Sequence, residues 1–207
     1  MTAPVDDVAS LYLDAAGTFA DVVREIDHSA WDGPGLGSWD LRSLVGHTSR
    51  ALVTVLAYLD QPAECEAIGS VEQYFALAAR QSTDSDAVLE RGRRAGEDLG
   101  DAPAEKVRQL VEQVAARLDG ADPEALITVL GGGIRVGNYL PTRTFELAVH
   151  SLDIGAATGI DVPLSVPVLT HTAALAARIA VALGQGQAVL TALTGRRPLP
   201  NGFSIVS

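Results

Sequence analysis

Four ionisable side chains recur at steps of three and four residues and therefore fall on one face of a predicted α-helix. They are Arg143, Glu146, His150 and Asp153. Glu146 and His150 lie four positions apart, so both can reach one metal ion from adjacent turns. A solvated charged face is the alternative on periodicity alone, because every amphipathic helix has one. The combination of an imidazole and a carboxylate favours a metal site.

A third ligand has to come from another helix. His28 lies beside a glycine-rich loop and His171 near the start of a late helix, positions where histidines are usually solvated. His47 lies in the middle of a predicted helix, on the flank of its apolar stripe, where a hydrogen-bonded core histidine is the alternative. Two imidazoles and a carboxylate suit Zn²⁺ with a fourth position open, with nickel or iron as alternatives. The predicted metal ligands are His47, Glu146 and His150, and an open position predicts catalysis or thiol binding.

The two other residues of this face are predicted to support the site. We expect Asp153 to accept the second N–H of a ligand histidine, because metal-bound imidazoles usually donate that proton to an acceptor. For Arg143, three roles stay open: pairing with Asp153, binding a substrate carboxylate, or lying in solvent.

Helical periodicity dominates the segments that must position these residues. Ser38 is the expected cap of the second helix, and the polar stretch 81–86 allows a break in the third. Pro4 is expected in the first turn of the first helix. The predicted helices cover residues 5–26, about 40–59, 71–96, 103–118, 141–157, 165–184 and 188–193.

The segments between these helices contain no long β pattern. Residues 122–130 are short enough to be helix or strand. The glycines at 131–133 and 137 predict a flexible connector, since no Lys-Ser/Thr pair follows them as a phosphate-binding loop would require. Residues 194–207 contain two prolines and should run extended over the surface. We therefore predict an all-α fold, a bundle with four long core helices, additional short helices and an extended C-terminal tail.

Composition excludes several classes of function. The chain has 207 residues and a net charge of −11, which disfavours nucleic acids and anionic membranes as partners. It has no apolar stretch of the ~20 residues needed to span a bilayer and no export signal, so we expect a cytoplasmic protein. Its one cysteine, Cys65, lies between two glutamates that would raise the thiol pKa. Any thiol chemistry must therefore use sulfur supplied by a small molecule.

Two motifs resemble those of a known family. The run from Gly37 to His47, GSWDLRSLVGH, resembles the Gly-Trp-x-Val-Arg-Asp-Leu-Val-x-His segment of the mycothiol-dependent maleylpyruvate isomerase family, within the DinB-like bundles. The run from Arg143 to Asp153, RTFELAVHSLD, resembles that family's second motif. Ser38 departs from the common glycine before the tryptophan. The resemblance covers most of the chain.

The resemblance implies a DinB-like four-helix bundle in which His47, Glu146 and His150 hold a divalent metal, usually zinc. Residues 1–160 would form this metal-binding bundle, and residues 161–207 a C-terminal helix and tail packed on it. The segment after His150 is short for the separate C-terminal domain of the isomerase proper, so the bundle is implied rather than the isomerase's own substrate.

The expected function is that of a metal-dependent enzyme with mycothiol as co-substrate. A metal-activated thiolate would attack a small electrophile, giving isomerisation if the thiolate is later eliminated and S-transfer if it is not. One alternative is a metal-binding or metal-free bundle that serves as a non-catalytic binding or dimerisation module, and the sequence allows a homodimer. Another is a hydrolase that uses metal-bound water.

Overall fold

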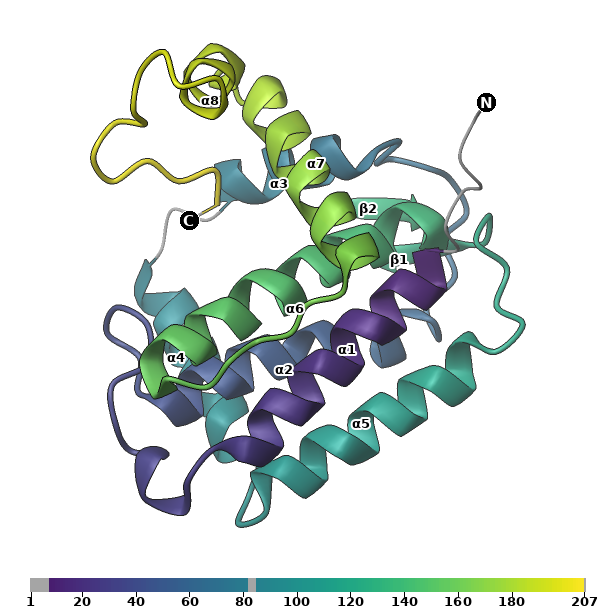
Figure 1. Cartoon of the computed structure of the whole chain (residues 1–207). Helices are drawn as coiled ribbons and strands as arrows, with labels where there is room; N and C mark the ends of the chain where they lie inside the picture. Colours follow the sequence, from purple (N-terminus) through teal and green to yellow (C-terminus); the bar gives the residue numbers. More distant parts are fainter. Residues whose placement is uncertain (1–7, 82–84, 207) are drawn as a thin grey trace.

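The computed structural model describes residues 8–81 and 85–206, and that part of the chain is mostly helical (Figure 1). A short antiparallel hairpin, β1 (Leu126–Val129) and β2 (Gly132–Arg135), precedes the longest helix. The helices are α1 (Val8–Glu25), α2 (Leu41–Tyr58), α3 (Val71–Gln81), α4 (Ser85–Glu97), α5 (Pro103–Leu118), α6 (Val136–Thr158), α7 (Val166–Ala182) and α8 (Gly186–Leu193), with a 3-10 turn at His28–Ala30. The predicted all-α bundle is confirmed.

The main core lies between α1, α2, α5 and α6, which run side by side, with α4 packed along α2 (Figure 1). Tyr12 in α1 is fully buried and its hydroxyl donates to the Ala51 carbonyl of α2 at 3.0 Å. The other large side chains buried in this core include Phe19, Leu41, Leu44, Leu52, Tyr139, Leu140, Leu147 and Ile154. The apolar stripes that predict the helices are the faces that meet here.

Helices α2 and α4 approach each other backbone to backbone. A Cβ added to Gly46 would lie 2.1 Å from the backbone nitrogen of Gly96, and a Cβ on Gly96 would lie 2.8 Å from the Arg42 carbonyl oxygen. Gly92, one turn earlier on α4, packs directly against the ring of Trp39, and an added Cβ would clash with that ring. Glycine is therefore required along this contact, which sets how deeply α2 lies in the bundle.

The N-cap of α2 is Asp40, so the prediction of Ser38 as the cap is wrong. The Asp40 carboxylate accepts from the Ser43 N–H at 2.7 Å. The backbone of the preceding loop fixes this start, because Leu41 N–H donates to the Gly33 carbonyl and a bridge joins Pro34 to Asp40.

Helix α6 begins at Val136, five residues before its predicted start at Pro141. Proline lacks an N–H and favours a first turn, which is why the sequence indicated a start there. The first donors of α6 instead find acceptors in the loop before β1: Val136 N–H donates to Ala125 and Gly137 N–H to Pro123. Pro141 consequently lies inside the helix.

The prediction of a flexible connector at the glycine run is wrong. These glycines form the turn and part of the second strand of the hairpin. Gly131 and Gly132 have φ of +108° and +126°, which favours glycine. A Cβ on Gly133 would lie 2.0 Å from the Cys65 carbonyl oxygen, so glycine also allows the 61–68 segment to pack here. A strand of four residues is too short to show a clear alternation of apolar and polar side chains. The sequence therefore did not decide between helix and strand for residues 122–130.

The third predicted helix is divided into α3 and α4, which pack against different partners. Helix α3 contacts α6 and α7, whereas α4 contacts α2. Residues 82–84, inside the stretch where a break was allowed, lie outside the described residues, as do Pro4 and the rest of the first seven.

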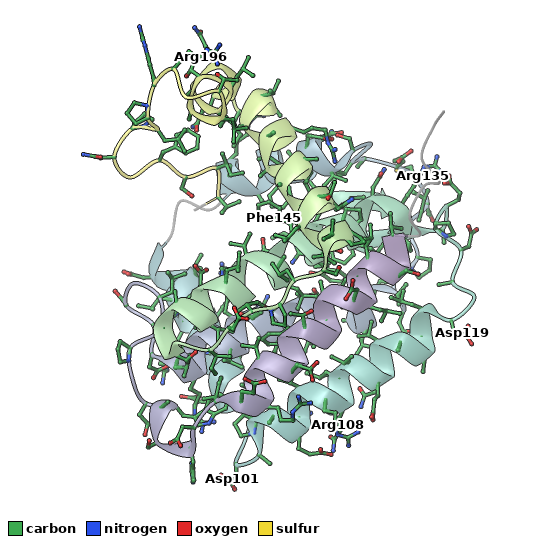
Figure 2. All side chains as sticks on the ribbon, in the orientation of Figure 1. Asp101, Arg108, Asp119, Arg135, Phe145 and Arg196 are labelled. Carbon is green, nitrogen blue, oxygen red and sulfur yellow. The ribbon has the colours of Figure 1, made fainter. Side chains whose placement is uncertain are left out.

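Helix α7 crosses α6 and α3 rather than joining the bundle (Figure 1). Its N-cap is Ser165, the first residue of the predicted range 165–184, and Gly184 with φ +75° follows its end. Phe145 of α6 lies beneath this crossing, whereas Arg196 lies far out on the segment after α8 (Figure 2). The second hydrophobic cluster comprises Val71, Phe75, Phe145, Leu175 and Ile179, with Ile205 and Val206 of the tail packed on it. No helix among the described residues is long and apolar enough to cross a membrane.

The glycine contact between α2 and α4 yields a stability prediction. We expect Gly46→Ala to lower the free energy of unfolding by at least about 2 kcal/mol, because the methyl group meets the backbone of α4. Gly17→Ala in α1 is the matched control. Nothing lies within 4 Å of its added Cβ, so the better helix propensity of alanine should stabilise by about 0.5–1 kcal/mol. Urea unfolding followed by circular dichroism measures both, and equal effects would contradict the close approach.

Candidate metal centre

His47 of α2 meets Glu146 and His150 of α6. Each residue offers one ligand atom, and these atoms lie within 4.8 Å of one another. The imidazole rings of His47 and His150 are edge to face with centroids 5.0 Å apart, and His150 Nε2 lies 3.4 Å from Glu146 Oε2. Within residues 8–81 and 85–206, these three form the one group of His, Cys, Asp and Glu side chains close enough to share a metal ion. His28 and His171 are not part of it.

Two cross-helix contacts set the register that brings these residues together. At one end His47 meets His150; two turns further along α2, Thr54 Oγ1 accepts from the Tyr139 hydroxyl at 2.9 Å. Because Tyr139 precedes His150 in α6, the two helices run antiparallel. The ionisable face of α6 therefore looks toward α2 and is not a solvated face: the side chains of Glu146 and His150 are 25% and 14% exposed.

Asp153 lies beside His150 on the side away from Glu146. Nδ1 of His150 is 3.0 Å from Asp153 Oδ2 and donates to it, which leaves Nε2 directed at Glu146. Burial lowers the pKa of His150, but its bonds to Asp153 and Glu146 outweigh this and raise the pKa to about 9. Burial by itself would raise the pKa of Glu146, but the bond to His150 and the charge of Arg143 outweigh burial and lower the pKa to about 2. Without a metal, Glu146 and His150 form an ion pair.

His47 has the opposite electrostatic character. Burial, followed by the charge of His150, lowers its pKa to about 4, so the imidazole is neutral at pH 7, the form that binds metals. Its Nδ1 is buried and has no hydrogen-bond partner within the described part of the chain. Buried polar nitrogens nearly always have a partner, and a neutral imidazole nitrogen without one is free to bind a metal ion.

The tryptophan of the first motif holds this histidine in place. Trp39 lies with its ring centroid 4.5 Å from that of His47, and its Nε1–H donates to the Leu89 carbonyl of α4 at 3.0 Å. Gly92 leaves room for the indole ring. Trp39 thus packs between α4 and His47 and limits the orientations of the imidazole.

These side chains fit a divalent metal. Two imidazoles and a carboxylate are the donor types that zinc takes in catalytic sites. The Nδ1–H bond from His150 to Asp153 is the arrangement that usually orients a ligand histidine. The unpartnered Nδ1 of His47 is consistent with this fit.

Arg143 neither pairs with Asp153 nor lies in solvent. Its Nε donates to Thr142 Oγ1 at 2.9 Å, and one terminal nitrogen donates to the Tyr74 hydroxyl at 3.1 Å. The guanidinium also lies over the Tyr74 and Tyr139 rings, 5.4 and 5.1 Å from their centroids. Asp153 is held by His150 instead.

Sequence reasoning missed both tyrosines of this cage. Tyr139 precedes the predicted start of the helix at Pro141, although its position four residues before Arg143 puts it on the same face. Tyr74 comes from α3, and nothing in its local sequence indicates that α3 packs on α6.

Comparison with family models connects this geometry to known proteins. The model described as the mycothiol maleylpyruvate isomerase N-terminal domain matches residues 12–155, a span that contains all of α2 and all three clustered residues. Searches of curated proteins and of solved structures returned no match. A match over well more than half of the chain establishes membership: the protein belongs to the family of the mycothiol maleylpyruvate isomerase N-terminal domain.

Proposed function

We propose that this protein is a metal-dependent enzyme that uses mycothiol as a nucleophile toward a small electrophilic substrate, in an isomerisation or an S-transfer. The observation that carries the proposal is the convergence of His47, Glu146 and His150, with donor atoms within 4.8 Å, in a chain of this family. The family's name supplies mycothiol as the thiol; the arrangement of the three side chains supplies the reason to expect a metal.

His47, Glu146 and His150 would hold the metal, with zinc expected and nickel or iron as alternatives. Three protein ligands leave a position for a small molecule. When bound, such a metal lowers the pKa of a coordinated thiol, so that the nucleophilic thiolate is present near neutral pH. The pKa of Glu146 lies well below 7, so its carboxylate is ionised at neutral pH. The contact with Asp153 fixes the ring of His150 so that Nε2 faces the cluster.

The sulfur would come from the small molecule, because the chain's own thiol lies elsewhere. Cys65 is exposed in the segment packed on β2 and is not part of the cluster. Addition of the thiolate to one carbon of an activated C=C bond forms a C–S bond and breaks the π bond, whose electron pair moves to the activating group of the substrate and leaves a single C–C bond that can rotate. If the electron pair returns after that rotation, the C=C bond re-forms, the C–S bond breaks, and the thiolate leaves an isomer of the substrate; if the substrate carbon takes up a proton instead, an S-conjugate remains. We assign this activity to the bundle, residues 1–160, with 161–207 packed on it.

Metal content is the first test. We expect the purified protein to contain about one zinc, nickel or iron ion per chain, measured by plasma mass spectrometry. His47→Ala and Glu146→Gln should lose most of it, because each removes one of three protein ligands. His28→Ala is the matched control, since that histidine is exposed and lies outside the cluster. A wild-type protein that holds no metal and takes none up would leave a metal-free binding module as the better description.

Asp153→Asn tests the supporting contact. The variant keeps the size of the side chain but loses the negative charge that fixes the His150 ring. We expect metal affinity to fall about 10–100-fold, measured by competition with a chromophoric chelator. Asp161→Asn, at an exposed position outside α6, should leave the affinity unchanged. Equal affinities for Asp153→Asn and wild type would mean that the contact does not orient a ligand.

Thiol dependence separates the proposed reaction from hydrolysis. The metal-loaded protein is incubated with unsaturated acids and other small electrophiles, with and without mycothiol, and products are analysed by mass spectrometry. We expect isomers or sulfur adducts only when both the metal and mycothiol are present. Products of water addition or cleavage that form without thiol would instead identify a metal-dependent hydrolase.

A further inference from the structure

Helix α7 has apolar side chains on both of its faces. Val168, Leu175 and Ile179 point into the molecule and are fully buried. The opposite face has Val166 and Val181 near its two ends, and these side chains are 76% and 67% exposed. A surface helix normally turns a polar face outward, whereas a helix that is apolar all round is normally buried. The outward face of α7 therefore lacks the cover that its composition calls for.

The outward face of α7 contains no charged side chain. Leu169, Ala173 and Ala177 lie between the two valines at steps of three and four, so they share this face. Arg178, the one charged residue of α7, lies to the side, where its Nε donates to Glu72 of α3 at 2.7 Å. The alanines in the middle of the face let a second helix approach closely.

Helix α8 extends this apolar face. It lies at the outer end of α7, away from the bundle, and none of its residues is buried (Figure 1). A Cβ added to Gly186, its first residue, would lie 2.6 Å from Cγ2 of Val181. Leu190 and Leu193 follow Gly186 at steps of four and three, so they continue the face beyond Val181, and they are 63% and 77% exposed. The α7–α8 face comprises Val166, Leu169, Ala173, Val181, Leu190 and Leu193.

Charge sets this part of the chain apart from the rest. All 26 acidic residues lie within residues 1–161, whereas residues 162–207 contain three arginines and no acid. Two copies of a protein with a net charge of −11 repel each other. Contact between two α7–α8 faces brings no carboxylate of these faces against another. The acid-free face is therefore where a second copy can approach at the lowest electrostatic cost.

The size of the face also fits a protein partner. Helices of 17 and 8 residues, at about 1.5 Å per residue and about 10 Å across, cover about 400 Å² in flat projection. Protruding side chains add to this area. The face thus reaches the upper part of the range that monomers expose, about 300–600 Å², and approaches the roughly 800 Å² per partner of a standard interface.

The two ends of the face differ in charge. At the start of α7, the Ser165 hydroxyl donates to the carboxylate of Asp14 in α1. Beyond the other end, Arg196 and Arg197 follow α8, and Arg196 lies far out from the bundle (Figure 2). Neither arginine forms an ion pair within the described residues. Antiparallel packing of two copies brings the acidic end of one toward the basic end of the other, whereas parallel packing brings like charges together.

We infer that this protein forms a homodimer in which the α7–α8 faces of two copies pack antiparallel about a twofold axis. The axis passes between Ala173 and Ala174, midway along α7 between Val166 and Val181. Val166 of each copy then meets Val181 of the other. The dimer is independent of the proposed function, because no residue of the metal cluster belongs to this face.

Sedimentation equilibrium of the full chain tests the dimer. We expect about twice the chain mass at micromolar concentration. Val181→Glu should weaken dimerisation at least about a hundredfold, because it places a charge in an apolar contact. Leu193→Glu provides a second disruption at an exposed position. Val53→Glu is the matched control, since Val53 is an exposed valine of α2 outside the face, and it should leave the dimer intact. Circular dichroism is recorded for every variant.

Disulfide formation tests the orientation. Chains with Val166→Cys and tagged chains with Val181→Cys, both also carrying Cys65→Ser to remove the exposed native thiol, are mixed and oxidised with diamide. Antiparallel packing predicts disulfides between the two kinds of chain. Disulfides that join only like chains would overturn the antiparallel arrangement.

Two results would overturn the dimer itself. One is a wild-type protein that stays monomeric at the highest concentration reached, and the other is a dimer that survives both Val181→Glu and Leu193→Glu. If the monomeric wild type instead binds phosphatidylcholine vesicles and Val181→Glu does not, the face belongs to a lipid surface and the homodimer is refuted.

Discussion

The antiparallel packing of α2 against α6 is the contact on which the rest of the site depends. It is held at one end by the ring contact of His47 with His150 and at the other by the hydrogen bond from Tyr139 to Thr54. Helix α2 cannot move away from α6 freely, because α4 lies against its other side at the closeness that Gly46 allows. A shift of one turn, about 5 Å along the axis, would separate the three clustered side chains.

The same interface must carry charge at positions that are mostly shielded from water. Burying ionisable groups is costly unless each has partners, and most partners here come from within α6. His150 bonds to both Glu146 and Asp153, and the hydroxyls of Thr142 and Thr144 donate to carbonyls of their own helix. What α6 does not satisfy is the Nδ1 nitrogen of His47, which has no hydrogen-bond partner in the described structure.

Where a helix begins or ends by rules local to the sequence, the prediction was accurate. Helix α5 spans Pro103–Leu118 as predicted, and Ser165 caps α7. The errors occur where a distant or irregular segment supplies the hydrogen-bond partners. Helix α6 starts before Pro141 because loop carbonyls accept its first N–H groups, and the glycines after β1 form a strand because the 61–68 segment packs on Gly133. Local spacing contains no information about either partner.

The sequence by itself determined the helical stripes, the family motifs and the three residues proposed as ligands, because side chains three or four positions apart share a face whatever surrounds them. Tertiary structure alone decided that this face of α6 is turned toward α2 and that Tyr74 and Tyr139 enclose Arg143. Those relations join residues dozens of positions apart. They depend on how helices pack, and the register of that packing is set by the sum of many contacts rather than by any local pattern.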